Sequence, residues 1–201
     1  MKKSVKQEFN KILKEYNWKN IDKVSWHNVS AYQKLSEGFI REFKDEVDWH
    51  RISKYQQLSE DFMREFKDEV HWHHISANQK LSEDFIREYK DKISWFWISQ
   101  DQKLSEDFIR EFKNKVYWSS ISEYQKLSED FIREFKDKLS WYRISKCQEL
   151  SFRFISEFRD KLDLNVLLKK ELITQEDIYE IYRPVNRFEL MDICSLSERI
   201  I

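Results

Sequence analysis

Five histidines are the residues of this sequence with the most direct potential for chemistry. His71, His73 and His74 lie close enough in the chain to suggest metal ligation, and on a helix His71 and His74 share a face. No cysteine lies near them, and His27, His50 and His73 recur at intervals of 23 residues instead. Neighbouring packed helices are about 8 to 10 Å apart, which separates such a row too far for one ion. We therefore expect no metal site and no cofactor.

Paired carboxylates such as Glu60 and Asp61 are the residue types that general acid–base catalysis uses. They recur at the start of an expected helix in copy after copy, where the helix dipole and solvent explain them. With one glycine and one proline in the chain, no phosphate-binding loop, dinucleotide fingerprint or nucleophile elbow can be written. No Ser-His-Asp or Cys-His arrangement stands out either. We therefore expect that the protein is not an enzyme.

The overall charge argues against a general polyanion-binding protein. The 201 residues include 36 basic and 37 acidic side chains, so the formal net charge is −1. Cys147 and Cys194 show no metal spacing or disulfide framework, which suits a reducing compartment and predicts a cytoplasmic location, in a bacterium or a host cell. The basic first residues run into polar sequence and no long apolar run follows, so we expect neither a signal peptide nor a membrane span.

Tryptophan recurs every 23 residues without an insertion, and this period defines the repeats. They begin at residues 26, 49, 72, 95, 118 and 141, and a degenerate seventh begins at residue 164. A repeat reads Trp, two variable residues, Ile or Val, Ser, one variable residue, often Tyr, and Gln, followed after one residue by Leu-Ser-Glu-Asp-Phe-Ile-Arg-Glu-Phe. One continuous helix is excluded, because 23 residues would rotate its apolar stripe by about 140° per repeat. The chain must therefore turn within each repeat.

Two short helices are expected in each repeat. Ser59, directly before Glu60 and Asp61, is typical of a helix N-cap, and the apolar spacing that follows predicts the longer helix. Trp72 and Ile75 mark a shorter helix before the corner.

A single repeat cannot bury its large apolar side chains, whereas stacked repeats share one core. We therefore predict an all-α fold, an α-solenoid of about seven stacked two-helix repeats over residues 26–186. Residues 1–25 and 187–201 are expected to form helical caps, with the second either covering the last repeat or joining two chains.

Serine and glutamine are identical by place in six copies: Ser30, Ser53, Ser76, Ser99, Ser122 and Ser145, and Gln33, Gln56, Gln79, Gln102, Gln125 and Gln148. A residue needed once for chemistry would appear once. We therefore interpret both rows as framework that satisfies the backbone of the turns or links successive repeats.

The second, third and sixth positions of the repeat vary most, while the seventh and the last are less constrained. The variable residues are His27, Asn28, Ala31, His50, Arg51, Lys54, His73, His74, Ala77, Phe96, Trp97, Gln100, Ser119, Ser120, Glu123, Tyr142, Arg143 and Lys146. All fall on the expected shorter helix, so stacking should align them on one continuous surface. The alternative is neutral drift at solvent positions, but drift should give Lys, Glu, Ser and Asn, whereas this set is rich in aromatic residues and arginine.

The residues predicted to bind a partner are His50, Arg51, His73, His74, Phe96, Trp97, Tyr142 and Arg143. Phe96 and Trp97 are expected to be an exposed pair and the main anchors. We expect replacement of both by Ser to abolish binding while leaving thermal unfolding nearly unchanged.

The frame Trp-x-x-Ile-Ser, followed by Gln-x-Leu-Ser-Glu-Asp-Phe-Ile-Arg-Glu-Phe, resembles the short Trp-containing helical repeats found as arrays in proteins of large DNA viruses, phages and AT-rich bacteria. The resemblance covers about residues 26–186. It implies a helical array that serves as an interaction surface. Some related arrays place Pro at the corner, where this sequence has Gln.

We hypothesise a non-enzymatic scaffold that binds a partner protein, in the specific form of a phage or mobile-element inhibitor of a host or competitor protein such as a defence nuclease. Near-identical copies with a variable face suit a protein that follows a changing partner. The alternative is nucleic-acid binding, in which free residues read one base per repeat and aromatic residues stack on bases. The balanced charge weakens that alternative. No membrane binding is expected, because the apolar faces are needed for stacking.

Overall fold

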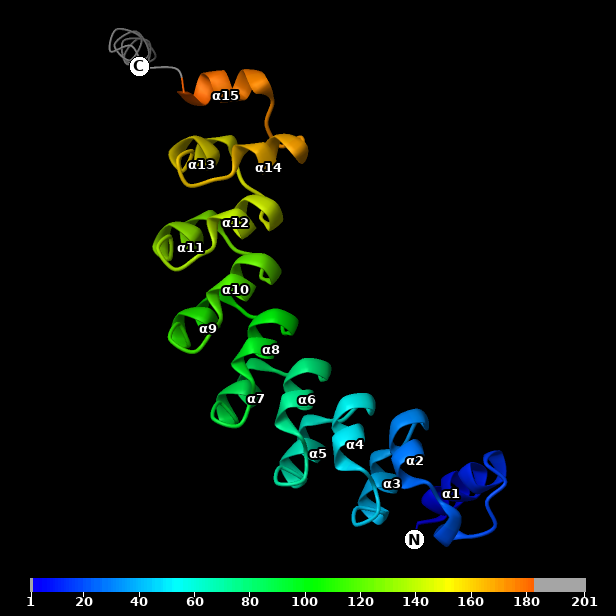
Figure 1. Cartoon of the computed structure of the whole chain (residues 1–201). Coiled ribbons are helices and arrows are strands. Elements are labelled where there is room, and N and C mark those ends of the chain that lie inside the picture. Colours follow the sequence, from blue (N-terminus) through cyan, green and yellow to red (C-terminus); the bar gives the residue numbers. More distant parts are fainter. Residues whose placement is uncertain (1, 183–201) are drawn as a thin grey trace, which may run out of the picture. The chain divides into compact units, whose positions relative to one another are not determined.

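The computed structural model describes residues 2–182, and this part of the chain is entirely helical, without strands (Figure 1). The all-α class is therefore confirmed. No helix among the described residues combines the length and apolar character needed to cross a bilayer. The expected C-terminal cap at 187–201 lies outside the described residues.

The helices alternate between two kinds, which we call Trp helices and Ser-capped helices. The chain begins with α1 (Lys3–Glu15) and a 3₁₀ turn (Ile21–Lys23). The Trp helices, the last of which starts with Leu, are α2 (Trp26–Tyr32), α4 (Trp49–Tyr55), α6 (Trp72–Asn78), α8 (Trp95–Asp101), α10 (Trp118–Tyr124), α12 (Trp141–Cys147) and α14 (Leu164–Lys169). The Ser-capped helices are α3 (Glu37–Glu42), α5 (Glu60–Glu65), α7 (Glu83–Glu88), α9 (Glu106–Glu111), α11 (Glu129–Glu134) and α13 (Phe152–Glu157), and α15 (Gln175–Tyr182) stands in their place in the seventh repeat. The two-helix repeat is confirmed.

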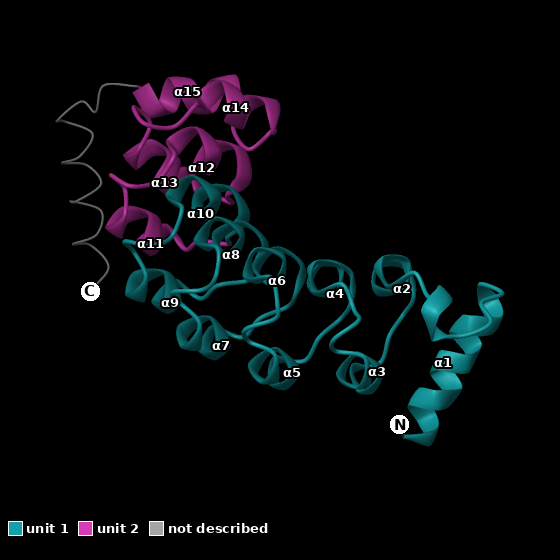
Figure 2. Cartoon of the chain, turned by 60° about the horizontal axis from the view of Figure 1, so that its bottom comes forward, with its two compact units in different colours: residues 1–125 teal, residues 126–201 magenta. Residues whose placement is uncertain are grey.

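The chain divides into two compact units, residues 1–125 and residues 126–201. In unit 1 the Trp helices follow one another in one row and the Ser-capped helices in a second row (Figure 2). Each Trp helix from α2 to α8 packs against the next Trp helix, and α1 packs against α3. In unit 2, α12 packs against α14. The repeats therefore stack as predicted.

The core is a regular series of apolar side chains contributed by both rows. The Phe at the third position of each Ser-capped helix from α3 to α13 is fully buried: Phe39, Phe62, Phe85, Phe108, Phe131 and Phe154. The tryptophan of a repeat packs on the aromatic residues of the Ser-capped helix that follows it. For example, the Trp72 ring stacks on Tyr89, with centroids 4.5 Å apart. No repeat could bury this surface alone, so stacking provides the hydrophobic stabilisation.

The expected order of helix lengths is wrong. The Trp helix α4 has 7 residues, whereas the Ser-capped helix α5 has 6 and ends at Glu65. A continued helix would use the carbonyl of Lys67 to accept the N–H of His71. Instead, the Lys67 carbonyl accepts the indole N–H of Trp72 at 3.0 Å, and the N–H of His71 donates to Ser53 Oγ of the Trp helix in the same repeat at 2.9 Å. These partners prevent a helical hydrogen bond between Lys67 and His71.

The Ser-capped helices begin as predicted. Ser59 Oγ accepts the N–H of Phe62, and the same cap occurs at Ser36, Ser82, Ser105, Ser128 and Ser151. The first-turn glutamate has a role beyond the helix dipole. Glu60 Oε1 accepts the backbone N–H of Ser82 in the next repeat at 2.7 Å. In the first repeat, Glu8 of α1 accepts the N–H of Ser36 at 2.9 Å and so takes the place that the first-turn glutamate has in later repeats.

Candidate functional site

The conserved glutamines form a buried ladder between repeats. Gln79 Nε2 donates to the carbonyls of Ser53 at 3.3 Å and Gln56 at 2.7 Å, and Gln79 Oε1 accepts the N–H of Leu58 at 3.1 Å. Gln56, Gln102 and Gln125 make the equivalent three bonds. Each side chain therefore satisfies the corner of the preceding repeat, which confirms that the row is framework.

The serine row joins the repeats in a second place. Ser53 Oγ donates to the Trp49 carbonyl at 2.7 Å and accepts the N–H of His71, the residue that begins the next Trp helix. Ser76 and Ser99 do the same for Ser94 and Tyr117. The polar atoms of the framework side chains therefore form hydrogen bonds within the array, and the variable positions remain as the candidate binding site.

The second and third positions of the repeat have different environments, contrary to the expectation of one uniform surface. The second position is exposed, while the third is exposed at Asn28, half-buried in most repeats and buried at Ser120. The third-position side chain turns toward the preceding repeat and meets its second-position side chain, 24 residues earlier. We call the three resulting contacts in unit 1 the inter-repeat seam.

The seam consists of three hydrogen bonds between successive Trp helices. Arg51 Nε donates to His27 Nδ1 at 2.8 Å, between α2 and α4. The Nε2 atoms of His50 and His74 are 2.8 Å apart, between α4 and α6. Trp97 Nε1 donates to His73 Nε2 at 3.0 Å, between α6 and α8. The seam therefore contains His27 and five of the predicted binding residues: His50, Arg51, His73, His74 and Trp97.

Four histidine rings, from α4, from α6 and from the N-cap of α6, lie close together in unit 1. The rings of His50 and His74 are 4.3 Å apart between centroids, those of His50 and His71 5.1 Å, and those of His73 and His74 5.7 Å. His74 lies at the third position, outside the row of His27, His50 and His73 that helix spacing was expected to separate, and a stagger of one position brings it beside His50. Nevertheless, no three His, Cys, Asp or Glu side chains of the described chain are arranged to hold a metal ion.

An exposed aromatic cluster continues the face beyond the seam. We define it as Phe96, Trp97 and Tyr117. Phe96 is 40% exposed, and its ring makes edge contacts with Trp97 at 4.9 Å and Tyr117 at 5.6 Å between centroids. Tyr117 is 50% exposed. Trp97 is half-buried and bonded to His73, so the expectation that it is exposed is wrong, whereas its role as a binding anchor stays a prediction.

Sequence reasoning did not select Tyr117, which lies at the last position of its repeat. That position is the N-cap of the next Trp helix, and it carries Asp48, His71, Ser94 and Tyr117 in successive copies. Its variability was the available signal. What the sequence did not show is that this N-cap residue lies beside the second position of its own repeat, as Tyr117 does beside Phe96.

Arg51 is held by the N-cap residue of its own helix as well as by the seam. Asp48 caps α4 by accepting the N–H of Arg51 at 3.2 Å, and its other oxygen lies 3.0 Å from His27 Nδ1 and 3.6 Å from Arg51 Nε. Burial alone would raise the pKa of Asp48, but the N–H of Arg51 and the neighbouring His27 together lower it below its usual value. Arg51 is therefore a neutralised, positioned cation.

The two remaining predicted residues belong to unit 2. Tyr142 and Arg143 follow Trp141 at the start of α12, where Tyr142 is 57% exposed and Arg143 is half-buried. They repeat the pattern of an exposed second position and a covered third position.

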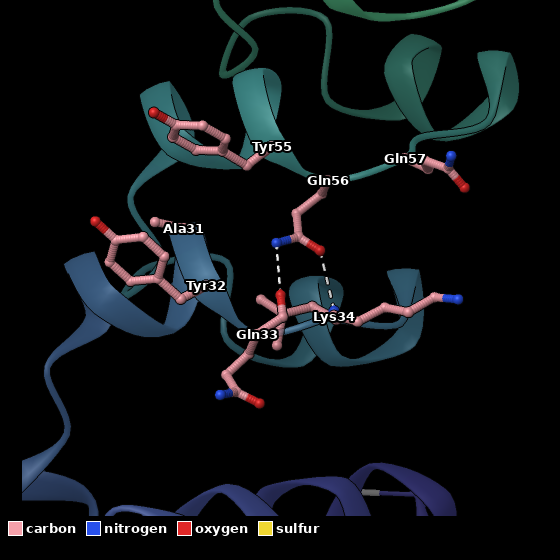
Figure 3. Close-up of a pocket in the computed structure, with 8 residues that line it drawn as sticks. Ala31, Tyr32, Gln33, Lys34, Tyr55, Gln56 and Gln57 are labelled. Atoms are coloured by element: carbon pink, nitrogen blue, oxygen red, sulfur yellow. Dashed lines mark hydrogen bonds between the residues drawn. The ribbon is translucent and has the colours of Figure 1, made fainter.

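A groove of about 510 Å³ lies at the corner between the first two repeats (Figure 3). Tyr32 and Tyr55 lie on the same side of it, and Gln56 spans it with the hydrogen bonds of the glutamine ladder. Tyr32 is 72% exposed and Tyr55 is 49% exposed. Sequence reasoning took the tyrosines as part of the repeat pattern, although the seventh position changes to Asn78 and Asp101 in the next copies.

Comparisons with known proteins add no further assignment. No model of a protein family matches the chain, and no curated protein and no solved structure is similar to it.

Proposed function

We propose that the chain is a non-enzymatic repeat scaffold that binds a partner protein through the Trp helices of unit 1. The observation that carries the proposal is the aromatic cluster, in which Phe96 and Tyr117 are large, exposed and held edge to edge. Aromatic residues supply much of the energy of protein interfaces, and they are costly on a surface without a partner. Ser119, the second-position residue of the next repeat, is small and polar, so the framework does not require an aromatic residue there.

The framework also explains how such a face can vary. The glutamine and serine ladders lie at positions other than the second and the last, so those positions accept new side chains without loss of the ladder bonds. This separation supports the more specific proposal of an inhibitor that adapts its face to a changing target protein. The repeat resemblance supports a phage or mobile element as its source.

Affinity capture from a bacterial lysate, with side-by-side variants, tests the proposal. We expect a protein that is retained by the wild-type chain and lost with Phe96→Ser/Tyr117→Ser. Both residues are exposed, so the melting temperature of this variant should stay close to that of the wild type. The double change of Phe96 and Trp97 is less informative, because Trp97 joins α8 to α6.

Tyr179→Ser is the matched control, because Tyr179 is 78% exposed and lies in α15 of unit 2. It should retain the same protein as the wild type. Equal retention by all three chains, or no retained protein, would contradict the proposal. Retained nucleic acid that is released steeply with salt would instead support the base-stacking alternative.

A further inference from the structure

All five histidines of the chain lie on one face of unit 1. They are His27 on α2, His50 on α4, His71 at the N-cap of α6, and His73 and His74 on α6. The other charged side chains on the Trp helices of unit 1 and at their N-caps are Asp48, Arg51, Lys54, Asp101 and Glu123. Asp48 and Arg51 face each other at 3.6 Å, and Asp101 accepts from Gln100 at 3.4 Å. The charge of this face is therefore set mainly by its imidazoles.

The seam contact between α6 and α8 requires a neutral histidine. An indole N–H can donate a hydrogen bond but cannot accept one. His73 Nε2, 3.0 Å from Trp97 Nε1, must therefore present a lone pair, which places the proton of the neutral ring on Nδ1. Protonation of His73 removes the acceptor and leaves two N–H groups facing each other. No carboxylate is hydrogen-bonded to His73 in the described chain, so no neighbouring acid compensates for its positive charge.

The contact between α4 and α6 imposes a related limit. At 2.8 Å, the Nε2 atoms of His50 and His74 share one proton, with one ring donating and the other accepting. One added proton on the donor ring leaves this bond intact, whereas a second places two N–H groups against each other. Burial lowers the pKa of His74, and the neighbouring His50, His73, Lys54 and His71 lower it further.

The contact between α2 and α4 differs, because an acid lies beside it. Arg51 can only donate, so His27 Nδ1 accepts while the ring is neutral. When His27 is protonated, Nδ1–H can instead donate to Asp48, which is 3.0 Å away. Protonation of His27 thus replaces its hydrogen bond with Arg51 by one with Asp48. Only the other two seam contacts lose a hydrogen bond without gaining another.

From these contacts we infer that the inter-repeat seam is controlled by protons. The bonds from α4 to α6 and from α6 to α8 are closed while the imidazoles are neutral. They open when protonation leaves no ring nitrogen that can accept the bond, so the seam responds to a fall in pH. Opening releases the Trp97 indole and gives a nearly uncharged face several positive charges. If the proposed protein binding at the aromatic cluster holds, acidification regulates that binding.

The inference is tested on the chain alone, without a partner, by following indole N–H resonances in ¹H–¹⁵N spectra from about pH 8 to about pH 5. Five framework indoles serve as internal references, because they donate to backbone carbonyls that do not titrate: Trp49, Trp72, Trp95, Trp118 and Trp141. We expect the Trp97 resonance to shift with a histidine inflection, by more than any reference.

Two variants identify the group responsible. His73→Gln supplies an amide oxygen that accepts from Trp97 at every pH, so the shift should disappear. His71→Gln removes a titrating ring of the same cluster that is not bonded to Trp97, so the shift should remain. The inference is overturned if Trp97 follows the five reference indoles, or if its titration persists in His73→Gln. Because no partner is present, failure of this test does not contradict the proposed binding function. Likewise, failure of the affinity capture does not contradict the inference about the seam.

Discussion

At the scale of single residues, glutamine side chains stabilise the array because each one forms hydrogen bonds with backbone groups at the corner of the preceding repeat. A corner leaves carbonyls and N–H groups that no helix pairs, and burial makes an unpaired group expensive. The Gln79 amide has one acceptor and two donor hydrogens, which match the N–H of Leu58 and the carbonyls of Ser53 and Gln56. In the seventh repeat, Lys170 takes the donor role of the glutamine amide. Its Nζ donates to the carbonyl of Ser145 at 3.4 Å and to that of Gln148 at 3.5 Å.

Gln79→Leu should therefore destabilise the chain strongly. It keeps an apolar side chain of similar length but leaves a buried N–H and two carbonyls without this partner, for an expected loss of about 2 to 5 kcal/mol of unfolding free energy. Urea denaturation followed by circular dichroism measures the change. Gln57→Leu is the control, because Gln57 is exposed and should change the unfolding free energy by less than about 0.5 kcal/mol. Equal losses in both variants would contradict the ladder.

The repeat tryptophan combines packing with a helix-ending hydrogen bond. Trp72→Ala should cost about 3 kcal/mol, the low end for a large aromatic residue, because the ring is only partly buried. Trp72→Phe keeps most of the contact with Tyr89 and loses the bond to the Lys67 carbonyl, so it should cost less. Thermal melting of the two variants separates these contributions. An unchanged melting temperature for Trp72→Ala would refute the stacked core.

His74 gives stability a dependence on pH. Its pKa is lowered in the folded chain, so the unfolded chain takes up a proton first as the pH falls through about 6.5. Stability from this residue is thus complete above that pH and decreases below it. His74→Gln should lose less melting temperature than the wild type between about pH 7.5 and about pH 5.5. Carboxylates titrate mainly below this window.

At the scale of elements, these helices are too short to persist alone. Isolated helices below about 12 residues are marginal in water, and the helices of one repeat have 7 and 6 residues. Their order comes from caps and from contacts with neighbouring repeats. On the Ser-capped row, Arg87 bonds Asp84 of its own helix and Glu111 of the next repeat, and it lies 4.9 Å from the Phe108 ring. The charged face is nearly invariant because it is an inter-repeat contact.

Removal of one N-cap should test this dependence. Ser82→Ala removes the acceptor for the N–H of Phe85 and should cost about 1 kcal/mol. Ser82→Thr retains a hydroxyl and should recover most of the loss. Equal unfolding free energies for the alanine variant and the wild type would show that packing alone fixes the start of α7.

At the scale of the whole molecule, the 23-residue repeat is the unit that can be added to or removed from the array. Each glutamine ladder bond in unit 1 joins a repeat to its immediate neighbour, at separations of 21 to 26 residues. Stability of such arrays is approximately a sum of repeat and nearest-neighbour terms. Removal of a whole repeat therefore allows the ladder bonds to form again between the repeats on either side, although their seam contacts change.

Deletion of residues 72–94 places Trp95 directly after His71, in the position of Trp72, so the chain should still fold with the same helical signal per residue. Its melting temperature should be lower, because one repeat and its contacts are missing. Deletion of residues 72–82 breaks the frame and should abolish cooperative unfolding. Circular dichroism melts of both deletions make the comparison. Similar behaviour of the two would contradict the 23-residue period as the folding unit.

The sequence by itself determined the class of fold, the repeat boundaries and the framework rows. These depend on local pattern, and six near-identical copies show which positions are fixed. Phe85, Ser82 and Gln79 could be assigned to core, cap and corner because each role has a residue type that suits it.

The tertiary structure alone decided the stagger between repeats. A contact between the second position of one repeat and the third of the next depends on how two Trp helices cross, and no local pattern encodes that offset. For this reason the sequence placed Trp97 at the surface and did not predict that His50 and His74 meet. Packing half-buries Trp97 and brings the two histidines into contact. The end of each Ser-capped helix was decided in the same way, by partners from elsewhere in the array that take its last carbonyls.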